Sequence, residues 1–197
     1  RILGRIRTVF PLMENAEITM ESSLSDMTDE KMDAAISGGV NRFSFGVQSF
    51  QTKIRNGIGR PLPREQAMER LAHFAKKDAL MILDLIYGLP GETEETMRQD
   101  IRDAKVCGAA GLDLYKLQLL AGSPLSKSFA KAGKTLEVPY LQALFRAAEE
   151  ELGVSGASNI SCTHWKWDAR EESVYNTLAA NGSDIFPIGM ACGGKIG

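Results

Sequence analysis

The sequence has 197 residues, of which 44% are hydrophobic and 24% are charged, and its formal net charge is -2. This balance is that of an ordinary globular domain that can bury a core. It excludes the strongly basic surface of a nucleic-acid-binding protein, and the chain has no run of about 18 apolar residues that could span a membrane. We therefore expect no nucleic-acid partner and no membrane span.

Strand and helix patterns alternate along the chain. Apolar residues at helical spacing predict a first helix over 1–10. Period-two alternation, or a continuous apolar run between turn residues, predicts strands over 16–22, 41–49, 79–90 and 111–120. Capping residues and a 3.6-residue period predict helices over 28–38, 63–77, 93–108 and 139–153. A strand–helix unit that recurs about every 30 residues predicts an α/β fold with a parallel sheet and right-handed crossovers.

The last part of the chain follows a different pattern. Residues 122–138 are predicted to form a connector, and from about residue 154 the sequence becomes polar. We expect a main domain over 1–134 and the start of a second, accessory domain over 135–197. Because a helical pattern is already present at the first residue and the chain ends in GMACGGKIG, we interpret it as a piece of a longer protein.

The cysteines indicate a reducing environment and no metal site. Cys107, Cys162 and Cys192 lie far apart, and none belongs to a C-x-x-C or similar metal-binding motif. An odd number of cysteines in a chain of this size is typical of a protein that makes no disulfide scaffold. We expect structural thiols, no metal ligand, and a cytoplasmic location.

Polar residues recur at equivalent places in the four predicted strands. Glu21 and Gln48 end the first two strands, Asp84 interrupts the apolar third strand, and Gln118 lies near the end of the fourth. Any one of them alone is best interpreted as a solvated strand end. Because ligands of parallel βα folds bind at the carboxyl ends of the strands, the set together predicts one pocket rich in carboxylate and amide groups. Such groups suit hydroxyls and amines.

Two other features leave alternatives open. The stretch GLPGET after the third strand has the form of a phosphate-binding loop, but it lacks the lysine of a P-loop, and a tight turn is the favoured interpretation. His164 stands between Thr163 and Trp165 in the polar C-terminal segment. It is either a ligand for a metal or a flat aromatic molecule, or an ordinary surface group.

Longer motifs resemble a known family. EITMES, NRFSFGVQSFQTKIRNGIGR, LDLIYGLPGET and GLDLYKLQLLAGSPL resemble the radical S-adenosylmethionine (SAM) enzymes of the coproporphyrinogen dehydrogenase group. HWKWDAREESVYNTL and IGMACGG are most similar to its branch of anaerobic heme-degrading methyltransferases. The resemblance implies a partial (β/α)6 barrel, of which four strand–helix units are present here. It also implies SAM and a [4Fe–4S] cluster, whose thiolate ligands are expected before residue 1.

The resemblance also implies an activity and its partners. The complete protein is expected to methylate heme and open its ring without oxygen, releasing iron, with electrons from a donor such as flavodoxin. Heme or a related tetrapyrrole is then the substrate. Because this chain has no C-x-x-x-C-x-x-C motif, we expect the 197 residues alone to be inactive.

Site residues follow from the resemblance position by position. Glu21 and Arg60 match the residues that hold the amino and carboxylate ends of the methionine moiety, and a guanidinium can grip a carboxylate with two bonds. Gln48 and Asp84 match the pair that binds the ribose hydroxyls. Gln118 matches a position near the adenine, expected to act through its backbone. His164 is a candidate contact for the substrate, and no catalytic residue is assigned.

Two other activities fit the same motifs. One is a heme-binding trafficking protein, or heme chaperone, and the other is an oxygen-independent coproporphyrinogen III dehydrogenase. The C-terminal segment around His164 and Trp165 favours the heme-degrading interpretation. Since four strands would leave a sheet edge exposed, we also expect the isolated chain to be poorly soluble.

Overall fold

The computed structural model describes residues 2–189 and 192–197. The helices of this described part are α1 (Ile2–Val9), α2 (Asp29–Ser37), α3 (Thr52–Gly57), α4 (Arg64–Phe74), α5 (Glu94–Val106), α6 (Pro124–Lys131), α7 (Val138–Val154) and α8 (Val174–Ala180). The strands are β1 (Thr19–Ser22), β2 (Arg42–Gln48), β3 (Leu80–Tyr87), β4 (Gly111–Lys116), β5 (Ser158–Asn159) and β6 (His164–Lys166). None of these helices combines the length and the apolar character needed to cross a bilayer. Two segments discussed above, the helix expected from residue 1 and the motif IGMACGG, fall partly outside the described residues.

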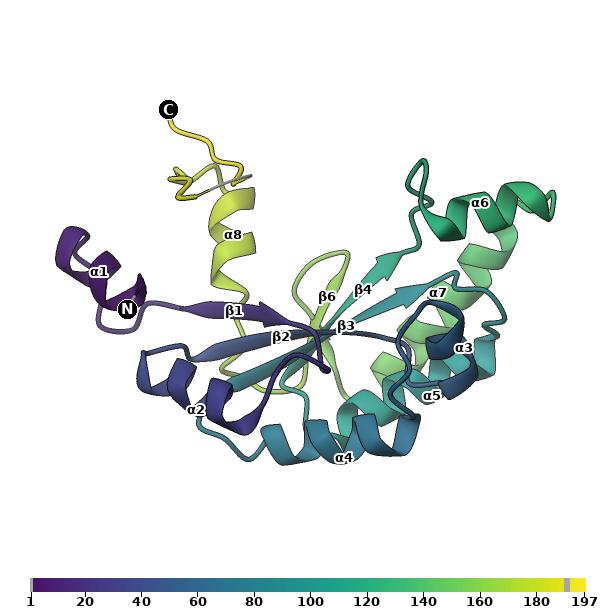
Figure 1. Ribbon diagram of the computed structural model, residues 1–197, viewed down its shortest axis with the longest axis horizontal. Helices are drawn as coiled ribbons and strands as arrows, with labels where there is room; N and C mark the ends of the chain where they lie inside the picture. The colour runs from purple at the N-terminus through teal and green to yellow at the C-terminus, as the bar shows by residue number, and fades with distance from the viewer. Residues whose placement is uncertain (1, 190–191) are drawn as a thin grey trace.

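The strands form one sheet in the order β1-β2-β3-β4-β6-β5. The first four strands run parallel, as predicted, and β6 pairs antiparallel with β4 and with β5. Helices α2, α4 and α5 lie along one face of the sheet, while α8 stands on the opposite side (Figure 1). The predicted α/β fold with parallel strand–helix units is therefore confirmed, and the sheet is open, as in a partial barrel.

The two faces of the sheet differ in chemistry because successive side chains of a strand point to opposite sides. On the helix-covered face the side chains are apolar and fully buried, and the ring of Phe45 stacks on that of Phe74 from α4 at 5.7 Å. The members of this core on the central strands are Phe43, Phe45, Val47, Met81, Leu83, Leu85, Leu112 and Leu114. The other face carries polar residues such as Ser44, Asp84 and Asp113 together with the buried Ile82. The sequence of β3 predicts a strand with apolar cover on both sides, but Asp84 belongs to the polar face.

Local signals placed most helix starts correctly. The hydroxyl of Thr28 accepts a hydrogen bond from the backbone of Lys31, and Thr93 forms a capping box with Thr96. The segment 122–138, predicted to be a connector, contains helix α6, which starts with Ser123 as N-cap and Pro124 in its first turn and was not predicted. Helix α3 was not predicted.

The C-terminal part of the chain joins the same sheet. Trp165 of β6 is 6% exposed and belongs to the main core, together with Leu144 and Leu152 of α7. Residues on both sides of position 134 thus contribute to one sheet and one core. The division into domains at this position remains a prediction about the complete protein.

Candidate functional site

A cavity of about 610 Å³ opens on the polar face of the sheet. Strand register explains its composition, because paired residues of parallel strands point to the same side: Glu21 pairs with Ser44, and Asp84 pairs with Asp113. The start of α8 closes the other side of the cavity. Its lining residues are Glu17, Thr19, Glu21, Arg42, Ser44, Asp84, Asp113, Tyr115, Ser173, Tyr175 and Asn176.

Asp84 is the central carboxylate of this cavity. Its Oδ1 accepts a hydrogen bond of 2.9 Å from the hydroxyl of Ser44. Burial raises the pKa of Asp84 to about 6, against the opposing effect of the Ser44 hydrogen bond, and the neighbouring carboxylates of Asp113 and Glu21 push in the same direction as burial. A carboxylate held this way is a strong acceptor with free capacity for the hydroxyls of a ligand.

Gln48 ends β2 in an unusual conformation. The register between β2 and β3 shifts between Gly46 and Gln48, and the φ angle of Gln48 is 70°, in the left-handed region that residues with a side chain rarely adopt. This bulge folds the amide back over Gly46: a Cβ atom at Gly46 would lie 2.7 Å from Nε2 of Gln48 and 3.5 Å from Nη2 of Arg60. Since Gly46 pairs with Asp84, the structure brings Gln48 and Arg60 next to Asp84.

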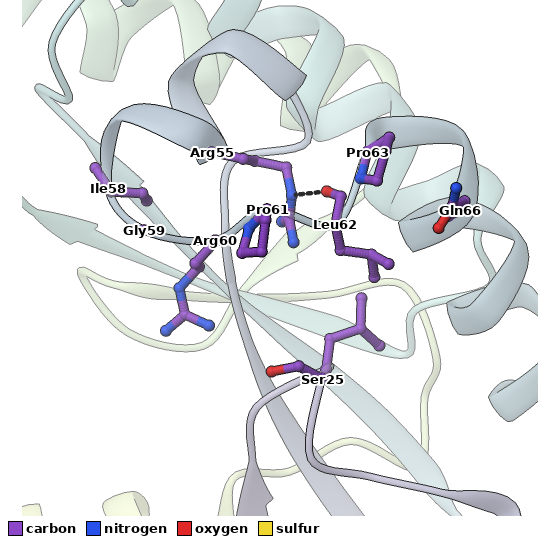
Figure 2. A pocket seen from close by; sticks show the side chains of 10 residues that line it. Ser25, Arg55, Ile58, Gly59, Arg60, Pro61, Leu62, Pro63 and Gln66 are labelled. Atoms are coloured by element: carbon purple, nitrogen blue, oxygen red, sulfur yellow. Dashed lines mark hydrogen bonds between the residues drawn. The ribbon is translucent and has the colours of Figure 1, made fainter.

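Arg60 lies in the segment between α3 and α4 and borders a second cavity of about 460 Å³. Its side chain points away from Pro61 and Leu62 (Figure 2). In the described part of the chain no carboxylate pairs with it. An unpaired guanidinium beside a carboxylate-and-amide cluster gives the site a place for an anionic group. Of the residues singled out from the sequence, Glu21 and Asp84 therefore line the cavity of about 610 Å³, and Arg60 lines the cavity of about 460 Å³. Gln48 lies with Arg60 beside Gly46, the strand neighbour of Asp84.

Gln118 and His164 are placed differently. Gln118 is exposed beyond the end of β4 and does not line the cavity, so its role near the adenine stays a prediction. The ring of His164 is buried, and its Nδ1 and Nε2 lie 2.9 Å and 3.2 Å from carboxylate oxygens of Asp113 and Glu171. A substrate has no access to this ring in the structure, and a substrate-binding role for His164 also stays a prediction.

The carboxylates around His164 belong to a buried ionic network beneath the cavity. Glu171 accepts hydrogen bonds of 3.0 to 3.2 Å from Nε and Nη2 of Arg42, and Glu17 lies 3.8 Å from the same guanidinium. Burial opposes the charge of His164, but Asp113 and Glu171 outweigh it and raise the pKa of the imidazole to about 9. Burial likewise opposes the charge of Glu171, but His164 and Arg42 lower its pKa to about 2. The network fastens the segment before α8 to the floor of the cavity.

Sequence reasoning missed three members of this region. Asp113 interrupts an apolar strand just as Asp84 does, so the same signal was available. Arg42 stands in the polar phase of its strand and could have been counted with Glu21. Glu171 lies in an irregular segment and gives no local signal, because its partner Arg42 is 129 positions away.

The cysteines do not form a metal centre in the described part of the chain. Cys107 is buried and Cys162 is exposed, and no group of three or more histidine, cysteine or acidic side chains there could hold a metal ion. The donor set of an iron–sulfur cluster is therefore not supplied by these residues. The cytoplasmic location inferred from the cysteines remains a prediction.

Known proteins resemble the chain in sequence and in fold. The model of the radical SAM superfamily matches residues 2–104. Anaerobilin synthase from Escherichia coli O157:H7 is 34% identical over 198 residues, which cover 100% of this chain and 44% of that protein. A heme chaperone HemW from Buchnera aphidicola (subspecies Acyrthosiphon pisum) is 28% identical over 208 residues, which cover 99% of this chain and 51% of the relative.

A solved structure shares the whole fold. Coproporphyrinogen III oxidase from Escherichia coli, described as a radical SAM enzyme, superimposes with a TM-score of 0.81 at 20% identity, over 100% of this chain and 48% of that chain. At this identity the likeness shows the fold alone. The chain spans about half the length of these relatives.

Proposed function

The chain belongs to the radical SAM superfamily, and from this membership we propose that its polar cleft binds S-adenosylmethionine within a complete protein that methylates heme and opens its ring. The names of these relatives, an anaerobilin synthase, a heme chaperone and a coproporphyrinogen III oxidase, all indicate a function that involves tetrapyrroles. The observation that supports the assignment of the cleft is that Glu21 and Asp84 line the cavity, while Gln48 and Arg60 lie beside Gly46, the strand neighbour of Asp84.

The chemistry of these residues fits the cofactor. The unpaired guanidinium of Arg60 suits the carboxylate of an amino acid, and the carboxylate of Glu21 suits its ammonium group. Gln48 and Asp84 offer an amide and a carboxylate acceptor for the two hydroxyls of a ribose. SAM, when bound, supplies an activated methyl group and a source of radical chemistry.

The chain's own residues would then hold and orient the cofactor. Asp84 must carry its negative charge to accept two hydroxyl hydrogen bonds, which requires a pH above its raised pKa of about 6. Ser44 keeps one carboxylate oxygen fixed by its hydrogen bond, so the other oxygen faces the cavity. The residues described do not supply cluster ligands, and we propose that the [4Fe–4S] cluster is held by another part of the complete protein.

Degradation of heme is preferred over the alternatives for two reasons. The relative named anaerobilin synthase is similar over the full length of this chain, at 34% identity. In addition, the C-terminal segment that resembles the heme-degrading branch is built into the cleft, where Ser173 and Asn176 line the cavity and Glu171 supports its floor. Heme trafficking and oxygen-independent porphyrinogen oxidation remain the alternatives, since similar proteins carry those names.

The test uses the complete protein with its cluster reconstituted without oxygen. The protein is given heme, SAM and electrons from reduced flavodoxin, and the products are analysed by mass spectrometry. A methylated, ring-opened and iron-free tetrapyrrole together with 5′-deoxyadenosine supports the proposal. Heme that stays bound but unchanged, with an intact cluster, favours trafficking, and decarboxylation of coproporphyrinogen III favours the third activity.

A further inference from the structure

Arg55 of α3 is a buried cation without an acidic partner. Its exposed fraction is 3%, and in the described part of the chain no carboxylate pairs with its guanidinium. The guanidinium instead donates to three backbone carbonyl groups, those of Val47, Ser49 and Leu62, at 2.7 to 2.9 Å. A buried charge that only backbone carbonyl groups stabilise costs free energy, so Arg55 is expected to have a role that compensates for this cost.

Two of these carbonyl groups flank Gln48. Nη1 of Arg55 donates to the carbonyl oxygens of both Val47 and Ser49, at 2.9 Å each. The φ angle of 70° at Gln48 lets the carbonyls on its two sides converge on one nitrogen. Conformations of this kind persist only when surrounding contacts enforce them. Arg55 thus supplies the contact that stabilises the left-handed turn carrying the Gln48 amide.

The same residue fixes the segment that carries Arg60. The backbone N–H of Arg60 donates to the carbonyl oxygen of Arg55 at 2.9 Å, and Nε of Arg55 donates to the carbonyl oxygen of Leu62 at 2.7 Å. Figure 2 shows the latter bond. The segment that presents Arg60 is therefore held to Arg55 on both sides.

A buried carboxylate completes the arrangement from the opposite side. Oδ1 of Asp100, from α5, accepts hydrogen bonds from the backbone of Phe50 and from the amide of Gln51. Asp100 thereby holds the residues that follow Ser49, while Arg55 holds those before and after Gln48. Arg55 is hydrogen-bonded both to the residues on either side of Gln48 and to the segment that carries Arg60.

We propose that Arg55 is a positioning residue that sets two cofactor contacts at once, the Gln48 amide and the Arg60 guanidinium. The inference rests on the proposed function, since it assumes that these two side chains bind SAM. It assigns Arg55 no contact with the cofactor itself. Two nitrogens of its guanidinium act on different contacts: Nη1 positions Gln48, and Nε positions Arg60.

The test measures binding of two probes to the complete protein with its cluster in place. S-adenosylhomocysteine carries both the ribose and the amino acid moiety, whereas 5′-methylthioadenosine lacks the amino acid moiety. Arg55→Gln is expected to weaken both probes by about tenfold, the size typical of supporting residues around a ligand site. Arg55→Lys places its ammonium near the Val47 and Ser49 carbonyls but has only carbon at the Nε position. It is expected to weaken S-adenosylhomocysteine alone.

A matched control separates positioning from general damage. Arg98 of α5 also donates to a backbone carbonyl, that of Ala147 on α7, and lies outside both cavities. Arg98→Gln is expected to lower the melting temperature and leave both affinities unchanged. If Arg55→Gln does not fold, Arg55→Lys still tests the inference. It is expected to weaken S-adenosylhomocysteine and to leave the affinity for 5′-methylthioadenosine unchanged.

The possible results are distinct. If the wild-type protein binds neither probe, the proposed function fails and the inference fails with it. If it binds both probes and the two Arg55 variants bind them equally well, the proposed function stands and the role of Arg55 is overturned. Loss of both probes with Arg55→Gln, and of one with Arg55→Lys, supports the inference.

Discussion

Asp84 combines a proposed ligand-binding position with an unfavourable charge. Its carboxylate is more easily protonated in the folded chain, where burial raises the pKa to about 6, than in the unfolded chain, where the ordinary value is 3.8. The folded state therefore binds more protons between these two pH values, and stability falls as the pH rises through this window. Above pH 6 the cost of the charge is fully present.

Replacing Asp84 by asparagine should separate stability from binding. At pH 8 we expect the free energy of unfolding of the complete protein to rise by at most about 3 kcal/mol, because the buried charge is gone and the amide oxygen can still accept from Ser44. The gain should shrink towards pH 5. Denaturant titrations at both pH values measure it. Asp168→Asn is the control, in which the free energy of unfolding should fall instead, because Arg170 lowers the pKa of the Asp168 carboxyl.

The same variant tests the ligand assignment. A neutral amide accepts ribose hydroxyls less strongly than a carboxylate, so the affinity for SAM should fall by about tenfold. Equilibrium dialysis of the cluster-loaded protein provides the measurement. An unchanged affinity in Asp84→Asn and in Asp84→Ala would show that this carboxylate does not hold the cofactor.

A substitution at Gly46 provides a second test at the level of a single residue. An alanine Cβ at this position would lie 2.7 Å from the amide nitrogen of Gln48, so the amide must move away from the cleft. We expect Gly46→Ala to weaken S-adenosylhomocysteine by about tenfold or more while leaving most of the stability intact. Gly57→Ala on α3 is the matched control, because a Cβ there meets no atom within 4 Å. Equal affinities in the two variants would contradict the placement of Gln48.

At the scale of elements, periodicity was a good guide to the central fold and a poor one to its short pieces. The strands of the parallel sheet and the helices between them each carry a full run of alternating or 3.6-period residues. Helix α3 has no side-chain cap, α6 follows a glycine-containing turn, and β6 has three residues, too few to display a period. Helix α6 does carry local signals, Ser123 as N-cap and Pro124 in its first turn, whereas α3 and β6 depend on tertiary contacts that no local pattern encodes.

The candidate site likewise has a part that the sequence predicted and a part that it did not. Glu21, Gln48 and Asp84 were predicted because polar residues recur at equivalent places in successive strands, and Arg60 because its motif resembles a family. The bulge at Gln48 and the buried position of His164 could not be predicted, because both depend on contacts with distant segments. For His164 these contacts are with Asp113 and Glu171, and they reverse the interpretation of a histidine as an accessible group.

The ionic network that joins β6 to the sheet should give stability a distinct pH profile. The folded pKa of His164, about 9, exceeds its ordinary value of 6.5, so its contribution is complete below pH 6.5 and is lost as the pH rises through 9. The folded pKa of Glu171, about 2, lies below 4.5, so its contribution is lost only as the pH falls through 2. Alkaline conditions should therefore loosen this contact first.

His164→Gln should flatten the alkaline part of this profile. We expect the wild-type protein to lose up to about 3 kcal/mol between pH 6.5 and 9 from this group, and the variant to lose little of it. Urea titrations across this range measure the difference. His73→Gln is the control, because His73 pairs with Asp29 at the surface and should keep the slope. Identical slopes in all three proteins would exclude a protonated His164.

In the whole molecule, the exposed edge of the sheet is the feature that most favours association with other molecules. Strand β1 pairs only with β2 in the described part of the chain, and its Met20 is 37% exposed. Unpaired backbone groups at such an edge recruit strands from other molecules. We propose that other segments cover β1 in the complete protein.

The 197-residue chain expressed alone should therefore self-associate. Size-exclusion chromatography with light scattering, over a range of concentrations, should show a mass that increases with concentration. Met20→Lys should reduce this association, since a charged side chain on an edge strand discourages strand addition. A monodisperse wild-type chain that unfolds cooperatively would contradict the prediction.

The pair between Arg42 and Glu171 also has a consequence for biosynthesis. Arg42 is synthesised early, but its carboxylate partner follows 129 positions later. While the chain is still on the ribosome, β1 to β4 can assemble with α2, α4 and α5, yet the floor of the cleft lacks the segment that neutralises Arg42 and carries the start of α8. The cavity on the polar face is thus complete only after the segment around Glu171 and the start of α8 have been synthesised.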